Sequence, residues 1–269
     1  MRTGNTRNMA ASVHRRLLDR ARESLRPFNE VLQHFAIERF IYRLSISPYA
    51  DKFILKGALM FPLWTGPSSR STLDIDLLGK IDNSTETIMA VIKKVCDTKV
   101  EDDGMHFDSN TLSAHKITED ADYGGVRVRI QATLGNAKIS LQIDIGFGDK
   151  IVPAPRRVKY PVILDFPAPA LNGYTMESTI AEKYQAMVKL GVANSRMKDF
   201  YDIWFLCRRF DFNGEVLAEA IATTFVNRRT PITTGPAVFN PSFAVDPAKK
   251  VQWQGFIRKA QLDDPPEDF

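Results

Sequence analysis

The stretch that decides the fold is RSTLDIDLLGK, residues 70–80. In it Asp74 and Asp76 alternate with leucine and isoleucine, and this period of two predicts a β-strand with one apolar and one polar face. Residues two apart on a strand point to the same side, so the two carboxylates share the polar face. They could face water at a strand edge, or they could share a cationic partner.

Two later segments have the same alternating design. Residues 126–133 and 139–145 each place apolar side chains on one face, and Asp144 lies on the polar face of the second segment. If its strand adjoins the first, three carboxylates converge. Two carboxylates about 4 Å apart repel by roughly 4 kcal/mol at an effective dielectric constant near 20. Because oxygen ligands favour Mg²⁺ or Mn²⁺ over zinc, Asp74, Asp76 and Asp144 are predicted ligands of such an ion.

The segments around these strands complete an α+β pattern, a mixed sheet with helices on one side. The predicted helices are residues 9–25, 28–45, 84–96, 175–189, 195–210 and 249–262. The acidic stretch 97–122 is predicted to be a hairpin and irregular loop, and the stretch 151–174, with its five prolines, a crossing segment. The expected parts are N-terminal helices at 1–50, a sheet core at 51–165 and a C-terminal helical part at 166–269.

Composition indicates an ordinary soluble globular protein. The net charge of +4 and the pI near 9.0 fit a nucleic-acid partner without requiring one. Cys96 and Cys207 are far apart and form no metal-binding spacing, which argues against structural zinc and favours a reducing, cytoplasmic compartment. The N-terminus lacks an apolar signal core, and no apolar run is long enough to span a membrane, so no membrane partner is expected.

Lys183 interrupts the apolar face of the 175–189 helix. Its ammonium group therefore needs a phosphate or a carboxylate, unless its stem lies along the surface and the head reaches water. Replacement by Met keeps the stem volume and is expected to leave folding nearly intact. Asp202 lies among aromatic residues on the next helix; it could pair with Lys198, orient Lys183, bind a base or ribose, or accept a proton.

A strand that ends at Gly57, a short helix, a loop and the Asp-x-Asp strand form the layout of a polymerase-β-like nucleotidyltransferase core. The other matching segments are ADKFILKGALMF (50–61), LQIDIGFGD (141–149) and AEKYQAMVKLGVANSRMKDFYDIWFL (181–206). On these segments the chain, over roughly residues 10–260, resembles the AbiEii/AbiGii toxins of bacterial abortive-infection and type IV toxin–antitoxin systems.

This resemblance implies a nucleotidyltransferase that uses a divalent metal, Mg²⁺ or Mn²⁺, to transfer a nucleotide from an NTP to RNA, in some cases to a tRNA 3′ end. It also implies a cognate antitoxin protein. Asp74, Asp76, Lys183 and Asp202 are the implied catalytic residues, with Asp144 as a third metal ligand. The candidate nucleotide-binding residues are Lys56, Gly57, Arg70, Ser71, Arg196, Lys198 and Asp199.

Some alternatives stay open. Gly57 is followed by Ala58, whereas such turns usually have Gly-Ser, so a hydroxyl contact to phosphate is missing. A catalytically inert binding module with this fold therefore remains possible. A glycosyltransferase that uses a sugar nucleotide would explain Asp74 and Asp76. It would not explain Asp144, Lys183 and Asp202.

For two further pairs of residues the sequence leaves two roles each. Arg70 and Ser71 could touch the triphosphate or cap a loop. Arg127 and Arg129 share the polar face of their strand, where they could hold RNA phosphates or face water.

Overall fold

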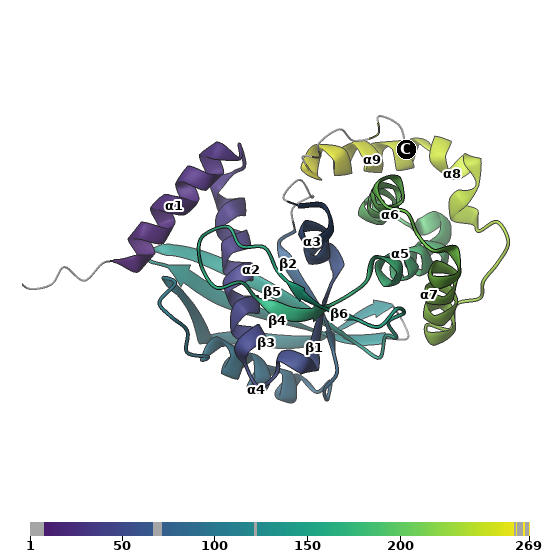
Figure 1. Ribbon diagram of the computed structural model, residues 1–269. Helices are drawn as coiled ribbons and strands as arrows, with labels where there is room; N and C mark the ends of the chain where they lie inside the picture. Colours follow the sequence, from purple (N-terminus) through teal and green to yellow (C-terminus); the bar gives the residue numbers. More distant parts are fainter. Residues whose placement is uncertain (1–7, 67–71, 121–122, 261, 263–265, 267–268) are drawn as a thin grey trace, which may run out of the picture. The chain divides into compact units, whose positions relative to one another are not determined.

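The structure is a computed structural model, and it describes residues 8–66, 72–120, 123–260, 262, 266 and 269. It confirms the predicted α+β class: the described residues form a mixed seven-stranded sheet with helices, followed by a C-terminal helical part (Figure 1). No helix in this part of the chain combines the length and apolar character that crossing a membrane requires.

The sheet has the strand order β3-β4-β5-β2-β1-β7-β6. Its strands are β1 Phe53–Lys56, β2 Asp74–Gly79, β3 Met105–Asp120, β4 Tyr123–Leu134, β5 Ala137–Phe147, β6 Arg156–Lys159 and β7 Ala170–Gly173. Strand β2 runs parallel to β5 and antiparallel to β1, while β4 is antiparallel to both β3 and β5. The two strands that carry the predicted metal ligands are therefore direct neighbours.

The predicted helices are confirmed within a few residues of their ends. They are α1 Met9–Glu23, α2 Phe28–Ile46, α4 Thr85–Cys96, α5 Met176–Leu190, α6 Met197–Arg209 and α9 Pro247–Ala260. The structure adds α3 Phe61–Thr65, in the short helical stretch expected after Gly57, and α7 Gly214–Asn227, for which there is no prediction. It also adds α8 Pro241–Val245, in the stretch 227–247 whose proline and glycine content predicts a loop, so that prediction is wrong there.

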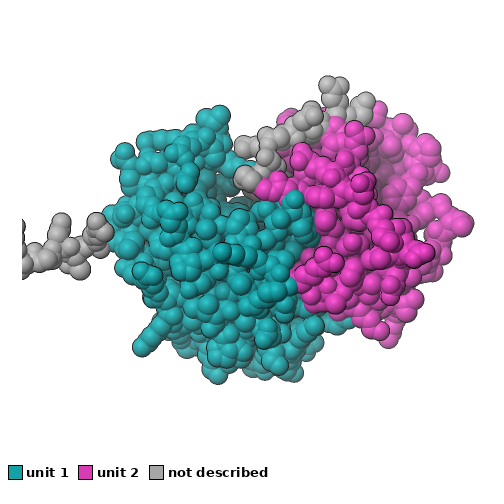
Figure 2. All heavy atoms as spheres, in the orientation of Figure 1, with its two compact units in different colours: residues 1–64, 71–148, 157–172 teal, residues 65–70, 149–156, 173–269 magenta. Residues whose placement is uncertain are grey.

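The described residues form two compact units (Figure 2). The first comprises residues 1–64, 71–148 and 157–172, with α1, α2, α4 and most of the sheet. The second comprises residues 65–70, 149–156 and 173–269, with α5 to α9. The three-part division expected from the sequence stays a prediction.

Alternating side chains cover one face of the sheet with apolar groups. On β4 and β5, Val128, Ile130, Leu141 and Ile143 are at most 1% exposed. Helix α2 packs against β5 and α4 packs against β3 and β4, and the two helices also contact each other. The core of the first unit thus lies between these helices and one face of the sheet, and the opposite face carries the polar side chains.

Helix α5 begins and ends at capping residues. The Thr175 hydroxyl accepts a hydrogen bond from the backbone N–H of Ser178, and Gly191 follows the helix with a φ of 51°. A hydroxyl at the first position and a glycine with positive φ after the last are common helix boundaries. They fix where α5 lies along the chain and so which of its residues face α6.

Two sequence expectations are wrong in part. Within the predicted hairpin and loop at 97–122, residues 105–120 are a long strand, one arm of a hairpin, rather than an irregular loop. Strand β3 is an edge strand, and its register with β4 shifts between Asp108 and Ser113, so its apolar period is interrupted. The stretch 151–174 is not only a crossing segment, because it contributes β6 and β7, which are too short to show a period.

Helix α2 carries an ion pair into the interior of the first unit. The side chains of Glu38 and Arg39 are 0% and 1% exposed, and Arg39 Nη2 lies 2.7 Å from Glu38 Oε1. The Ile163 N–H donates to Glu38 at 2.7 Å, and Arg39 donates to the Pro167 carbonyl oxygen at 2.9 Å. The pair therefore attaches the proline-rich segment to α2.

The pKa values of two buried groups near this segment are shifted in opposite directions. Burial raises the pKa of Glu38 to about 7, against the opposing effect of Arg39. Burial, assisted by Arg26, lowers the pKa of His34 to about 4. The Glu38 contribution to stability is thus lost as the pH rises from about 4.5 to 7, while the His34 contribution is gained between about pH 4 and 6.5.

Replacing Glu38 by Gln should leave the His34 contribution unopposed. Between pH 4.5 and 6.5 the free energy of unfolding of Glu38→Gln is expected to rise with pH more steeply than that of the wild type, by about 1.4 kcal/mol per pH unit. Urea unfolding at several pH values measures this slope. Glu86→Gln, on exposed surface of α4, is the control and should leave the slope unchanged; equal slopes for both variants would contradict the prediction.

Candidate active site

The strand register brings two of the predicted carboxylates side by side. Asp76 on β2 is the direct partner of Asp144 on β5, and Asp74 is the partner of Gln142. Ile75, between the two aspartates of β2, is fully buried, whereas the aspartates are partly exposed. Neighbouring strands lie about 4.8 Å apart, so Asp74, Asp76 and Asp144 share one polar surface of the sheet.

Asp144 already has a cationic partner within the chain. Arg127, its direct neighbour on β4, donates through Nε and Nη2 to the two carboxylate oxygens of Asp144, both at 2.7 Å. The carboxylate is 9% exposed. Among the described residues no three His, Cys, Asp or Glu side chains are arranged to hold a metal ion. A metal ion at Asp144 would therefore have to share the carboxylate with Arg127.

Gly57 lies directly against Asp76. It follows β1 with a φ of 69°, a conformation that other residues rarely adopt. A Cβ atom at this position would overlap with the carboxylate of Asp76. The backbone turn after β1 and the central aspartate thus fit together only because residue 57 has no side chain.

Lys56 extends this row of charges on the other side. It is the register partner of Asp76 on β1, and its Nζ lies 3.5 Å from the place that a Cβ on Gly146 of β5 would take. The row across four strands is therefore Lys56, Asp76, Asp144 and Arg127, with a cation at each end. Arg70 and Ser71, the other candidates near β2, lie outside the described residues.

In the second unit, Lys183 forms a buried ion cluster. Its Nζ lies 2.6 Å from Asp199 Oδ1 and 2.8 Å from Asp202 Oδ2, and both carboxylates are fully buried. Arg196 Nε lies 2.7 Å from the second oxygen of Asp199. Of the alternatives for Lys183, the carboxylate partner is correct. Asp202 pairs with Lys183 and so orients its ammonium group, while Lys198 is exposed on α6.

The cluster keeps Asp199 charged. Burial alone would raise the pKa of its carboxyl group, but the attraction of Lys183 and Arg196 outweighs burial and lowers the pKa below its usual value. Because the ammonium group is shared by two carboxylates from one helix, it also joins α5 to α6.

The candidate residues thus fall into two groups. The first unit brings together Lys56, Gly57, Asp74, Asp76 and Asp144. The second unit brings together Lys183, Arg196, Asp199 and Asp202. From the sequence, Lys183 is also predicted to reach the carboxylates of the sheet, close enough to contact the phosphates of a nucleotide held there, and this stays a prediction.

Sequence reasoning missed Arg228, which follows α7. It donates to both oxygens of Asp149 at 2.9 Å, and its Nη2 lies 3.3 Å from Glu182, the residue before Lys183. The Tyr174 hydroxyl donates to the other oxygen of Glu182 at 2.8 Å. The sequence contained one indication of this interaction. Asp149, the charged last residue of the LQIDIGFGD segment, needs a cationic partner.

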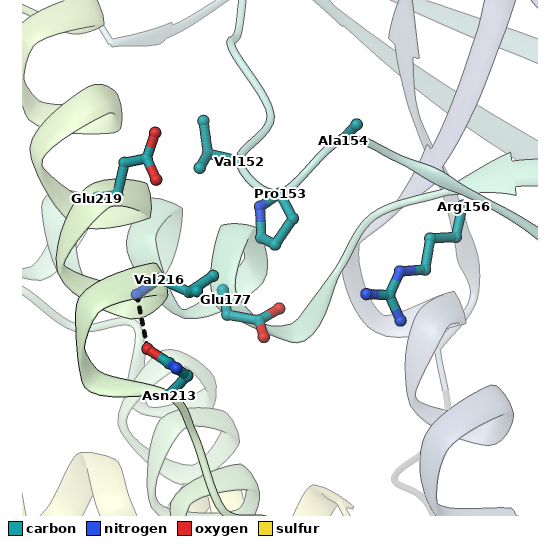
Figure 3. A pocket seen from close by; sticks show the side chains of 8 residues that line it. All are labelled: Val152, Pro153, Ala154, Arg156, Glu177, Asn213, Val216 and Glu219. Carbon is teal, nitrogen blue, oxygen red and sulfur yellow. Dashed lines mark hydrogen bonds between the residues drawn. The ribbon is translucent and has the colours of Figure 1, made fainter.

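A pocket of about 620 Å³ lies in the second unit (Figure 3). It is lined by Val152, Pro153, Ala154, Arg156, Glu177, Asn213, Val216 and Glu219. None of the candidate residues is among these described lining residues, so the pocket carries no part of the candidate site.

Comparison with known proteins identifies one family. The family described as "Nucleotidyl transferase AbiEii toxin, Type IV TA system" matches residues 39–269. No curated protein sequence matches the chain significantly.

Two solved structures are similar, both from Helicobacter pylori. The protein JHP933 is 13% identical, with a TM-score of 0.47, and the match covers 86% of this chain and 93% of that one. A protein provisionally assigned as a nucleotidyltransferase is 14% identical, with the same score and 86% and 96% coverage. Similarity of this extent carries no argument about fold or function.

Gly57→Ala should lower the free energy of unfolding by more than the backbone strain of a positive φ accounts for. Gly135→Ala is the matched control, because Gly135 also has a positive φ, 58°, but a Cβ there meets only Ala10 Cβ at 3.7 Å. The control should lose about 1 kcal/mol of unfolding free energy. Gly57→Ala should lose at least about 1 kcal/mol more, since Asp76 must move. Denaturant unfolding measures both, and equal losses would refute the close fit of Gly57 and Asp76.

Lys183→Met is now expected to destabilise the protein, contrary to the expectation from sequence. It leaves Asp199 and Asp202 buried without their shared cation, which should cost about 3 kcal/mol or more. Lys189→Met, on exposed surface of the same helix, should change the stability by less than about 0.5 kcal/mol. Adding Asp202→Asn to Lys183→Met should recover part of the loss. Similar melting curves for the two single variants would show that the cluster does not depend on Lys183.

Proposed function

Because the chain belongs to the AbiEii nucleotidyl transferase toxin family of type IV toxin–antitoxin systems, we propose that it transfers a nucleotide from an NTP to RNA, with a tRNA 3′ end as one acceptor. The observation that supports this most is the polar face of β2, where Asp76 adjoins Asp144 and closes against Gly57. In the proposed reaction the RNA 3′-hydroxyl oxygen attacks the α-phosphorus. A new bond forms between this oxygen and the α-phosphorus while the bond from the α-phosphorus to the α–β bridging oxygen breaks. Pyrophosphate leaves with the bridging oxygen, and the hydroxyl proton passes to water.

Asp74 and Asp76 would hold a divalent ion, Mg²⁺ or Mn²⁺. Both supply carboxylate oxygens from one face of β2, and both are partly exposed. This donor set fits Mg²⁺, which commonly binds through one or two carboxylates together with substrate phosphates. When bound, the ion would stabilise the negative charge that develops on the phosphates. Asp144 is the proposed third ligand, shared with Arg127.

The chain's own residues would bind and orient the NTP. Lys56, at the end of the charge row, would contact the triphosphate, and the turn at Gly57 would let the nucleotide approach the backbone. Lys183 and Asp202 are the proposed catalytic residues of the second unit. Further nucleotide contacts are proposed for Arg70, Ser71, Arg196 and Lys198. Asp199, which is fully buried, would act by positioning Lys183 and Arg196.

Membership of the family implies an antitoxin protein as partner. The proposed place of action is the cytoplasm, where NTPs and RNA occur together. A second candidate function is an inert module with this fold that binds nucleic acid or antitoxin. Ala58 favours it, since this turn lacks the hydroxyl that usually contacts phosphate. Family membership makes the glycosyltransferase alternative unnecessary.

Asp76→Asn should abolish transfer. Loss of a residue that only supports a metal ligand costs about 10–100-fold, so loss of a direct ligand should cost more than about 100-fold. The assay incubates the protein with each labelled NTP, Mg²⁺ and total cellular RNA. Asp97→Asn, an exposed carboxylate in the same unit, should retain full activity. If the wild type transfers no nucleotide from any NTP, the inert module becomes the better explanation.

A further inference from the structure

The half of the sheet formed by β5, β4 and β3 has an open polar face. Opposite the apolar face that α2 and α4 cover, Arg129, Gln131, Lys138 and Ser140 are exposed. An antiparallel sheet commonly leaves one face to solvent. This face, however, is continuous with the strand that carries Asp74 and Asp76, because β5 pairs with β2.

The register arranges the side chains of this face in rows across the strands. The row of Asp74 continues with Gln142 on β5, Arg129 on β4 and Ser113 on β3. Arg129 Nη2 lies 3.4 Å from the side-chain oxygen of Gln142. Two strand spacings of about 4.8 Å separate Asp74 from Arg129, so an exposed guanidinium group lies about 10 Å from the predicted metal ligands.

Lys138 lies farther along the same face. Its row contains Thr133 on β4 and His106 on β3. It is six residues from Asp144 on β5, which corresponds to about 20 Å along the strand. We name the surface that contains Arg129, Lys138, Gln131, His106 and His115 the open sheet face; all five are exposed. Arg127 is excluded from it because it pairs with Asp144.

The chemistry of the open sheet face fits nucleic acid better than protein. Its five defining side chains are basic, amide and imidazole groups, which bind phosphates, riboses and base edges. Asp108, the register partner of Gln131 on β3, is less exposed, and its carboxylate accepts hydrogen bonds from Asn110. The exposed large apolar side chains of the described chain lie outside β3, β4 and β5, so these strands lack the apolar anchors of a protein interface. The face also has no Phe, Tyr or Trp among the five residues that define it, which indicates contact with the backbone rather than base stacking.

We propose that the open sheet face binds the single-stranded end of an RNA, with phosphates on Arg129 and Lys138, and leads its 3′ end to Asp74 and Asp76. This inference rests on the proposed function, since it gives the acceptor a path to the site of transfer. Because the contacts are to the backbone, binding is independent of sequence and depends strongly on salt.

The experiment measures the dissociation constant for a fluorescent single-stranded RNA at several salt concentrations, with Arg129→Gln, Lys138→Gln and the double variant. Each single variant should weaken binding at low salt and reduce the slope of log K against log salt by about 0.7, and the double variant by about 1.4. Lys94→Gln, an equal charge change on α4, is the control and should leave the slope unchanged. Circular dichroism melting curves establish that each variant is folded.

Transfer kinetics provide the second readout. The variants should raise KM for RNA and leave kcat and KM for the NTP unchanged. If the wild type transfers nucleotide but neither the slope nor KM for RNA changes in the double variant, the inference is overturned and the proposed function stands. If RNA binding changes as expected but no transfer occurs, the RNA path stands and the proposed function fails. Weakened binding of the purified antitoxin with unchanged RNA affinity would make the face a protein interface and overturn the inference.

Discussion

Repulsion between Asp76 and Asp144 is the constraint on which the first unit depends. The parallel pairing of β2 and β5 places the two aspartates beside each other, at a strand spacing of about 4.8 Å. The surrounding residues offset this repulsion with positive charge and leave space for the carboxylates. Arg127 pairs with Asp144 through two hydrogen bonds, Lys56 occupies the next position beyond Asp76, and the bare backbone of Gly57 leaves room for the central carboxylate. The sheet thus supports a concentration of negative charge without burying it unpaired.

The second unit also brings two carboxylates close together, but in its interior. Two carboxylates from α6 are fully buried, and they are neutralised by Lys183 from α5 and by Arg196. On the sheet the carboxylates keep partial contact with solvent, whereas here the charges are removed from it. An interior cluster of this kind allows little freedom in the position of the ammonium group, because any movement lengthens one of two short contacts.

Hydrophobic periodicity in the sequence predicted the strands and helices that have one side in the core and the other side in contact with solvent. Strands β2, β4 and β5 and helices α1, α5 and α6 each bury one face, so their apolar residues recur regularly. Strand β3 lies at the edge of the sheet with a shifted register, and β6 and β7 have four residues each, so periodicity was absent or too short. The pairing of Arg127 with Asp144 depends on strand register, which the sequence of neither strand contains. Arg228 was missed for a related reason, since its partners Asp149 and Glu182 are distant in sequence.

The ion pair of Arg127 and Asp144 also has a consequence for the energetics of binding. A cation bound to an oxygen of Asp144 would draw charge away from the hydrogen bonds with Arg127 and weaken them, so the guanidinium group would attract an anion more strongly. Cation and anion binding at this row of charges would therefore be linked, and each would increase the affinity for the other by the same factor. The pair would then act as a bridge between two ligands, in which a cation shares the carboxylate and an anion shares the guanidinium group.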